Sequence, residues 1–244
     1  MVLAYRDLKV RYAQTFLGLS WALIQPLVTL LIFTLIFGRA IKVETEGIPY
    51  PVFALAGMGA WAYFSFVMSQ SGGSIIAAGE MVKKIYFPRL IIPASKALVA
   101  GVDLMVTYLL LILLMFYYQV PISTNWVFLP IFLLINIVAS LGVGIWLSAL
   151  TIRFRDFQHV IPFLVQIGLY ASPIAYPDSM ITDSYQWLYH INPMAGIASG
   201  FRWAFFGTDT LNELDALSFT VSFLLFFSGV YYFKRVENVM ADLV

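Results

Sequence analysis

Few side chains able to do acid–base or ligand chemistry stand inside the apolar stretches of this sequence. Asp103 is the one acidic residue well inside such a stretch, and an ionisable group within a membrane span is a functional candidate by default. Lys96 lies two turns earlier on the same helical face, and an arginine of a neighbouring helix is the alternative partner. With these cations available, we interpret Asp103 as half of a structural polar pair. Ion-coupled transport is weakly supported, because it usually needs several intramembrane ionisable groups.

The remaining polar residues form no catalytic pattern. His159 and His190 are isolated, the first at an expected cytoplasmic boundary and the second in the expected outer segment, and a lone histidine at a boundary is usually structural. The sequence has no GxxxxGK(S/T) loop for nucleotide phosphates, no HExxH and no GxSxG. It also has no cysteine, which excludes disulfides and thiolate metal sites. We therefore predict no catalytic, cofactor-binding or metal-binding residue in this chain.

Composition places the chain in a bilayer. Hydrophobic residues make up 61% and charged residues 11%, against about 25% charged in soluble domains. A membrane-spanning helix needs about 20 consecutive apolar residues. Four runs without Asp, Glu, Lys or Arg meet or approach that length: 12–38, 47–79, 104–152 and 216–233. The expected fold class is an all-α integral membrane protein.

We predict six transmembrane helices. The run 104–152 is too long for one crossing, and QVPISTN (residues 119–125) supplies turn residues that divide it. No linker or repeat is evident, so residues 1–244 are expected to form a single transmembrane domain. The predicted spans are residues 19–38, 52–71, 92–117, 127–149, 160–176 and 217–233.

Lysine and arginine are distributed unequally between the loops. If the N-terminus is cytoplasmic, 11 of the 14 basic residues lie on the cytoplasmic side, as the positive-inside rule favours. The exceptions are Arg39, Lys42 and Arg202. We therefore expect a multi-pass protein with both termini in the cytoplasm.

Residues 1–18 are expected to form an amphipathic helix at the membrane interface. An aromatic stripe with basic flanks lies flat at the headgroup boundary, although an ordinary cytoplasmic start to the first span is the alternative. The stripe, at three- and four-residue spacing, consists of Tyr5, Leu8, Tyr12 and Phe16. The charged residues off the stripe are Arg6, Asp7, Lys9 and Arg11.

The outer segment, residues 177–216, has its own helix signals. Asn192 is a good N-cap and Pro193 suits the first helical position. The 14 residues from 193 to 206 would span only about 21 Å of helix, short of a roughly 30 Å hydrocarbon core. With SYQWLYHIN just upstream, we predict short re-entrant helices beside a pathway, where irregular backbone is tolerated. The alternative is a cap on the bilayer surface.

Two further patterns concern contacts. Small residues recur four apart at Ala97 and Gly101 and at Ser140, Gly144 and Ser148, which favours close helix packing. Aromatic residues make up 17% of the chain; most would face lipid, but together they suit a channel for sugars.

The segment EMVKKIYFPRL (residues 80–90) places a basic, proline-containing turn between two apolar spans. Its cations, its apolar side chains and the turn at Pro88 suit docking to a partner protein. Alternatively, the cations set topology and bind anionic headgroups. From these residues alone the two interpretations are even.

The order of motifs resembles the permease subunits of ABC transporters that export polysaccharides such as O-antigen, capsular polysaccharide and teichoic acid. YRDLKVRYAQTFLGLSWALIQPLVTLLIFTLIFG (residues 5–38) is similar to their basic interfacial helix followed by LGxxWxxxxP, here Leu17, Gly18, Trp21 and Pro26. FRD (154–156), SPIAYP (172–177) and NP (192–193) match as well, so the resemblance covers essentially the whole chain. Because the chain begins close to the interfacial helix, we expect a short preceding segment to be missing.

The resemblance implies a homodimer of permeases bound to two nucleotide-binding ATPase subunits that carry ATP and Mg. It implies a bacterial inner (cytoplasmic) membrane location among membrane lipids, with a lipid-linked polysaccharide as cargo and no nucleic acid. It also implies a coupling loop at residues 72–91 that docks into the ATPase through Glu80, Lys83, Lys84, Tyr86, Phe87, Pro88 and Arg89. Candidate channel-lining residues are Trp21, Phe33, Phe37 and Tyr170, and candidate outer-gate residues are Trp187, Tyr189, Asn192, Pro193 and Trp203.

The implied function is ATP-driven export of a lipid-linked polysaccharide from the cytoplasmic side, by a chain that is not itself an enzyme. The nearest alternative is an ABC exporter permease for a drug or lipid. More distant alternatives are an intramembrane lipid-linked sugar or acyl transferase, which should show clustered intramembrane carboxylates or histidine, and a stand-alone channel, which needs no ATPase.

Overall fold

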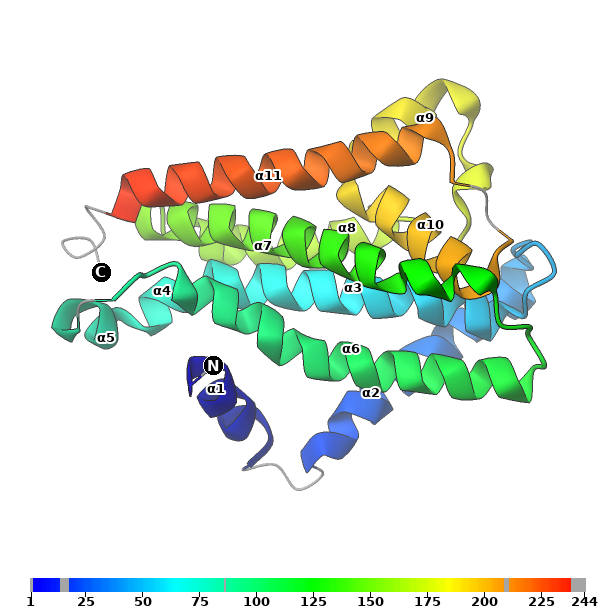
Figure 1. Cartoon of the computed structure of the whole chain (residues 1–244), viewed down its shortest axis with the longest axis horizontal. Coiled ribbons are helices and arrows are strands. Elements are labelled where there is room, and N and C mark those ends of the chain that lie inside the picture. Colours follow the sequence, from blue (N-terminus) through cyan, green and yellow to red (C-terminus); the bar gives the residue numbers. More distant parts are fainter. Residues whose placement is uncertain (1, 14–17, 86, 209–210, 238–244) are drawn as a thin grey trace.

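The computed structural model describes residues 2–13, 18–85, 87–208 and 211–237, and these ranges are helical with no strand (Figure 1). The all-α prediction is confirmed for them. The elements, in which η marks a 3-10 or π segment, are α1 (Val2–Ala13), η1 (Gly18–Ser20), α2 (Trp21–Phe33), η2 (Thr34–Ile41), α3 (Tyr50–Gly72), α4 (Ser74–Ala77), α5 (Gly79–Lys84), α6 (Ile91–Tyr117), η3 (Thr124–Phe128), α7 (Leu129–Arg153), α8 (Phe157–Ala171), η4 (Asp178–Met180), α9 (Asp183–Tyr189), α10 (Pro193–Phe206) and α11 (Glu213–Glu237).

Five of the described helices are long and apolar enough to cross a membrane. They are Trp21–Ile41, Tyr50–Gly72, Ile91–Tyr117, Thr124–Arg153 and Glu213–Glu237, each overlapping a predicted span. The expected fifth span, residues 160–176, is wrong at its C-terminal end. Its helix, α8, has 15 residues, about 22 Å, and stops at Ala171. Ser172 is extended because the proline that follows disfavours helical backbone at the preceding residue.

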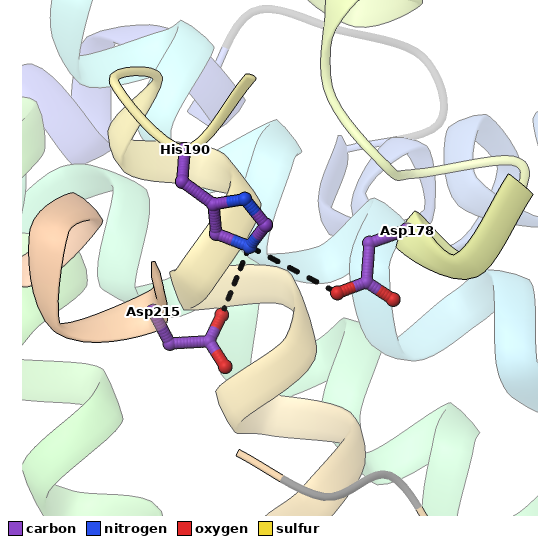
Figure 2. A group of neighbouring side chains, drawn as sticks. All are labelled: Asp178, His190 and Asp215. Atoms are coloured by element: carbon purple, nitrogen blue, oxygen red, sulfur yellow. Dashed lines mark ion pairs between the residues drawn. The ribbon is translucent and has the colours of Figure 1, made fainter. Parts of the chain in front are cut away.

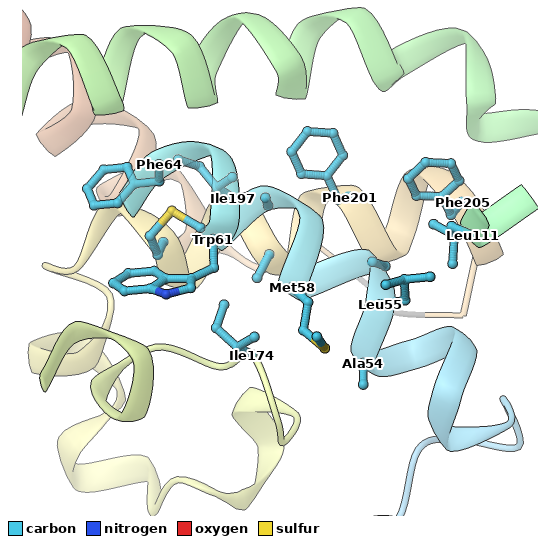
Figure 3. Packing of buried hydrophobic residues seen from close by; sticks show 14 of the residues in the cluster. Ala54, Leu55, Met58, Trp61, Phe64, Leu111, Ile174, Ile197, Phe201 and Phe205 are labelled. Atoms are coloured by element: carbon cyan, nitrogen blue, oxygen red, sulfur yellow. The ribbon is translucent and has the colours of Figure 1, made fainter. Parts of the chain in front are cut away.

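Helix α3 is the centre of the bundle. It packs against α6 on one side and α7 and α10 on the other, and 78% of its membrane-span window is buried (Figure 1). Trp61 and Phe64 of α3 stack with ring centroids 5.7 Å apart, and Phe201 and Phe205 of α10 stack at 6.4 Å (Figure 3). The core therefore lies mainly between α3 and α10.

Helix α2 lies at the edge of the bundle, and only 17% of the window that includes it is buried. Figure 1 shows α1 and α2 beside the α3–α6 pair, on the side away from α11. Both α2 and α8 contain an interior proline, Pro26 and Pro162. Since proline removes a backbone hydrogen bond and kinks a helix, these two helices are the structurally weakened ones.

The two ends of the bundle carry different elements. Figure 1 shows α4, α5 and the C-terminal ends of α7 and α11 at one end, and α9 with the start of α11 at the other. The first end carries Lys83, Lys84, Arg153, Lys234 and Arg235. The basic segments are thus gathered at one end, in keeping with the predicted alternation of spans.

Small residues mark the closest helix crossings, although not all of the predicted ones. A Cβ on Gly144 would lie 2.8 Å from Cβ of Ser71, so α7 approaches α3 there as predicted. Gly101 faces open space. A close approach of glycine to another helix backbone was not predicted: a Cβ on Gly142 of α7 would lie 2.7 Å from the backbone nitrogen of Phe226 in α11.

We predict that Gly142→Ala lowers the unfolding temperature of the purified chain, because the added methyl group pushes α7 and α11 apart at a cost of roughly 1–3 kcal/mol. Gly101→Ala is the matched control: it also replaces a helical glycine, with nothing within 4 Å of the new atom, and should be neutral or stabilising. Equal unfolding temperatures for the two variants would contradict the close crossing.

Candidate functional site

A cavity of about 370 Å³ lies between α2, α3, α6 and α8. Polar side chains within it include Gln25, Thr29 and Ser65, and its aromatic walls include Phe33, Trp61 and Phe66. Apolar rings beside hydrogen-bonding groups suit a ligand with both C–H faces and hydroxyls. The other lining residues are Arg11, Ala22, Pro26, Met58, Ala62, Ser69, Gln70, Ala100, Asp103, Thr107 and Leu169.

The structure brings only some of the predicted channel residues together. Phe33 lines the cavity, and Phe37 packs edge-on against it with ring centroids 5.5 Å apart. Trp21 lies in a smaller adjoining pocket, and Tyr170 is 65% exposed on α8. Sequence reasoning did not single out Gln25, whose signal is a polar side chain within an otherwise apolar span.

Helix α1 is fastened to α6 by two ion pairs. Nη1 of Arg11 lies 2.6 Å from Oδ2 of Asp103, and Nζ of Lys96 lies 2.5 Å from Oδ2 of Asp7. Asp103 is therefore a paired group, as interpreted, but its partner is Arg11, since Lys96 is occupied by Asp7. The Arg11 guanidinium also stacks over Phe66, 4.5 Å from the ring centroid.

The predicted interfacial helix is described as α1, without residues 14–17. Tyr5 is 69% exposed and Val10 71% exposed, so this apolar edge faces away from the bundle while Asp7 and Arg11 face α6. Arg6 pairs with Asp7, and Lys9 is exposed. The side chains of Tyr12 and Phe16 lie outside the described residues.

Beyond α8 the chain leaves the helix, and side-chain donors from other elements, two of them buried, satisfy its backbone. Nη2 of Arg202 donates to the Ile174 carbonyl at 3.0 Å, and the Tyr50 hydroxyl donates to the Ala175 carbonyl at 2.9 Å. Nδ2 of Asn192 donates to the Ala171 carbonyl at 3.2 Å. Buried backbone groups need such partners, particularly at membrane depth.

Arg202 of α10 is enclosed by protein and 1% exposed, so this cation does not meet hydrocarbon, where it would be costly. Its guanidinium carbon lies 3.7 Å from the ring centroid of Phe53 in α3. Gly57 lets α3 come this close, since a Cβ there would lie 3.0 Å from Nη2 of Arg202. The cation is thereby satisfied by an aromatic face and a carbonyl.

The predicted N-cap of α10 is confirmed. Oδ1 of Asn192 accepts the Met194 backbone N–H at 3.0 Å, and Pro193 occupies the first turn. The Asn192 side chain therefore caps α10 and tethers the end of α8 at once. Nearly every residue of α10 is buried, with Trp203 partly exposed.

A groove of about 580 Å³ lies beside the end of α8, and the structure brings only some of the predicted gate residues to it. Tyr189 lines it, whereas Trp187 is 56% exposed. Burial raises the pKa of the Tyr189 hydroxyl, which donates to the Tyr176 hydroxyl at 3.2 Å. Trp203 packs elsewhere, with its ring centroid 5.3 Å from that of Phe128. The structure thus separates Trp203 from Tyr189.

The predicted coupling loop contains two short helices, α4 and α5. Ile75 and Val82 are buried in a cluster with Phe233 of α11, and Phe87 packs against that cluster. The backbone N–H of Arg89 donates to Oε1 of Glu237 at 3.2 Å, and its guanidinium donates to the Glu237 carbonyl. Phe87 and Arg89 therefore attach the loop to α11.

The remaining loop residues make an exposed surface. Glu80 and Lys84 form an ion pair of 2.7 Å with both side chains at least 72% exposed. Lys83 and Pro88 are also exposed, and Ile85 is 59% exposed. Tyr86, the other predicted contact residue, lies outside the described residues.

We predict that Arg202→Met lowers the unfolding temperature, because the buried Ile174 carbonyl loses its donor at a cost of about 1–3 kcal/mol. Arg39→Met is the matched control, since Arg39 is exposed and its loss should change stability by less than about 0.5 kcal/mol. Thermal unfolding in detergent compares the two. If both variants unfold at the wild-type temperature, Arg202 does not secure the broken backbone.

Comparison with known proteins assigns a family to this architecture. The ABC-2 type transporter family matches residues 1–206. An O-antigen export system permease protein RfbA of Klebsiella pneumoniae is 29% identical over 246 residues, covering 100% of this chain and 94% of the relative. The protein of that name from Myxococcus xanthus is 28% identical, covering 96% of this chain and 92% of the relative.

A further relative, the polysialic acid transport protein KpsM of Escherichia coli, is 26% identical over 242 residues and covers 96% of this chain and 92% of its own. The resemblance drawn from the motifs is thus confirmed along nearly the full length. Five long apolar helices, a cavity lined by aromatic and polar side chains at the edge of the bundle, and this match lead to one conclusion: the chain belongs to the ABC-2 type transporter family of membrane permeases.

Proposed function

We propose that this chain is the membrane subunit of an exporter that moves a lipid-linked polysaccharide outward across the bacterial cytoplasmic membrane. The observation that carries the proposal is the cavity beside α2, which the rings of Phe33 and Trp61 line together with the polar side chains of Gln25 and Thr29. Sugars suit such walls because their C–H faces lie on rings while their hydroxyls bond polar groups. The names of the full-length relatives, O-antigen and polysialic acid transport proteins, support this cargo class.

In the proposed assembly two copies of the chain flank the path, and residues 1–244 act as one transmembrane domain. Helix α8 is the shortened fifth of six spans, and α9 and α10 form the re-entrant outer segment. The exposed faces of α2 and α8, which carry Trp21 and Tyr170, look onto the path. Because Pro26 and Pro162 interrupt these two helices, they are the ones that tilt while α3 stays in place.

Energy comes from two copies of a separate ATPase subunit, which carry the ATP and Mg, and this chain binds neither of them itself. The exposed side of α5, with Glu80, Lys83 and Lys84, is the proposed contact for that subunit. Phe87 and Arg89 pass the movement to α11 through their attachment to it. The basic end of the bundle, including both termini, is then cytoplasmic.

Reconstitution tests the cargo. Proteoliposomes containing the chain and its ATPase partner should move a lipid-linked glycan when ATP is supplied, whereas the chain alone should move none. Phe33→Ala combined with Phe37→Ala should slow glycan movement several-fold by removing the aromatic wall, without changing complex formation. Phe223→Ala, which removes an exposed ring from α11, is the matched control. Transport of a drug or short lipid but no glycan would refute the proposed cargo.

Charge reversal tests the docking face. Lys83→Glu with Lys84→Glu should reduce co-purification of the ATPase at least several-fold, because both lysines are exposed at the tip of α5. Arg39→Glu with Lys42→Glu makes the same charge change at the other end and should leave the complex intact.

Phe87→Ala with Arg89→Ala should give a different result: the ATPase still binds, but hydrolysis no longer drives export because the loop is detached from α11. Native binding and native export in both loop variants would refute the docking role of residues 72–91.

A further inference from the structure

Three side chains that can ligate a metal converge at the outer end of the bundle, although the sequence predicted no metal site. Asp178 begins η4, His190 lies in the turn between α9 and α10, and Asp215 lies in the first turn of α11 (Figure 2). Nε2 of His190 lies 3.5 Å from Oδ1 of Asp215 and 3.9 Å from Oδ2 of Asp178. One donor atom from each residue falls within 4.8 Å of the other two. Sequence spacing gave no signal because three separate elements supply the ligands.

The hydrogen bond of the other imidazole nitrogen fixes the tautomer. Nδ1 of His190 lies 2.8 Å from the Gln186 carbonyl oxygen, which can only accept, so Nδ1 carries the proton. In the neutral ring, Nε2 then presents its lone pair to the two carboxylates. This arrangement, with Nδ1–H bound to a backbone carbonyl and Nε2 free, is the usual one for a metal-ligating histidine.

The converging atoms are buried and lack hydrogen-bond partners. The His190 side chain is 1% exposed and that of Asp215 is 2% exposed. Nε2 of His190 and Oδ1 of Asp215 have no hydrogen bond among the described residues. A lone pair facing buried carboxylate oxygens is repulsive, and each unsatisfied buried group carries a desolvation penalty. A cation between them removes both costs.

Either a proton or a metal ion supplies that positive charge. Burial lowers the pKa of His190, but the Asp215 carboxylate, the Gln186 carbonyl and Asp178 outweigh it and leave the pKa raised. A proton on Nε2, however, points at one acceptor, and both oxygens lie beyond the 3.2 Å limit of a good N–H···O bond. It also balances only one of two carboxylate charges. A divalent ion meets all three donors and balances both.

The geometry points to a site for a divalent transition metal of the Zn²⁺ class, ligated by Asp178, His190 and Asp215. Tetrahedral bonds of about 2.0–2.1 Å place ligand atoms about 3.3 Å apart. The 3.5 Å separation of His190 from Asp215 is close to this value, whereas the 3.9 Å separation of His190 from Asp178 exceeds it, so Asp178 must move inward on binding. An imidazole ligand disfavours Mg²⁺ and Ca²⁺, which prefer oxygen donors.

The surroundings of the site are already ordered. Oδ2 of Asp215 accepts the Asn212 backbone N–H at 2.9 Å, which leaves Oδ1 for the ion. The Ser218 hydroxyl donates to the His190 carbonyl at 2.7 Å and so ties the ligating turn to α11. Asp178 is 24% exposed, which gives the ion an entrance and leaves room for water as a fourth ligand. A bound ion would join η4, the α9–α10 turn and α11 into one unit.

The chain is well suited to a direct test because it has no cysteine and only one other histidine. The full-length protein, purified with a tag free of histidine and stripped with EDTA, is titrated with Zn²⁺ and analysed for bound metal. We expect one zinc per chain and a rise in unfolding temperature that EDTA reverses. His190→Ala and Asp215→Asn should each weaken zinc binding by about 100-fold or more. His159→Ala removes the exposed histidine at the start of α8 and should bind zinc as the wild type does.

Loss of zinc binding could also result from misfolding of a variant, so a second experiment looks for a new spectroscopic signal instead of a loss. Asp178→Cys should still bind metal and, with Cd²⁺, show the thiolate charge-transfer absorption that this cysteine-free protein lacks. No zinc uptake by the wild type, or equal uptake by His190→Ala, would overturn the proposal. Stability that depends on His190 without any zinc uptake would also overturn it and assign a protonated imidazole to the cluster. These readouts require no transport, so they are independent of the proposed cargo.

Discussion

The architecture depends on satisfying a stretch of non-helical backbone inside a helical bundle. After Ala171 the chain turns away from helix, and its carbonyls at Ala171, Ile174 and Ala175 are met by Asn192, Arg202 and Tyr50. In lipid such a break would be prohibitively costly, so α10 must lie inside the bundle to deliver two of these donors. The buried arginine, the capping asparagine and the close approach of α3 at Gly57 all serve this one requirement.

Around that secured region the molecule divides into a packed centre and a loosely joined edge. Helices α3, α6, α7, α10 and α11 share the core, and glycine crossings bring α7 against α11 and α3. Helices α2 and α8 contain interior prolines, and together with α3 and α6 they line the cavity. A permease needs this combination, because a pathway can change shape only if some helices move against others that do not.

Much of the fold follows from the sequence because charge-free length and turn chemistry are local properties. The spans over α3 and α6 were predicted to within two residues at each end, and the Asn192–Pro193 helix start was confirmed. The early end of α8 has a local cause, the proline after Ser172, and was missed because hydrophobicity continues past it. The sequence left two possible partners for Asp103, Lys96 and an arginine of another helix. Only the fold decides between them, because it places Arg11 beside Asp103.

What sequence reasoning missed depends on contacts between distant segments. From the sequence alone, Arg202 is an arginine in an apolar segment with no evident partner. The fold supplies its partners, the ring of Phe53 and the carbonyl of Ile174. Gly142 gives no stronger signal than Gly101, yet only the former lies against another backbone. Likewise, the sequence suggests that Phe87 and Arg89 are free to contact a partner protein. In the structure both residues contact the C-terminal end of α11.

The weak burial of α2 determines which forces keep it in place. The apolar side chains of α2 are solvated nearly as well by lipid tails as by protein. Separating α2 from the bundle therefore costs little packing energy. The chain just before α2 is instead secured by the pairs Arg11–Asp103 and Asp7–Lys96. Coulombic attraction of this kind weakens with ionic strength, and anionic headgroups compete for the same cations. Ionic strength and anionic lipid therefore weaken the attachment of α1 to α6, and with it the hold on the segment that leads into α2.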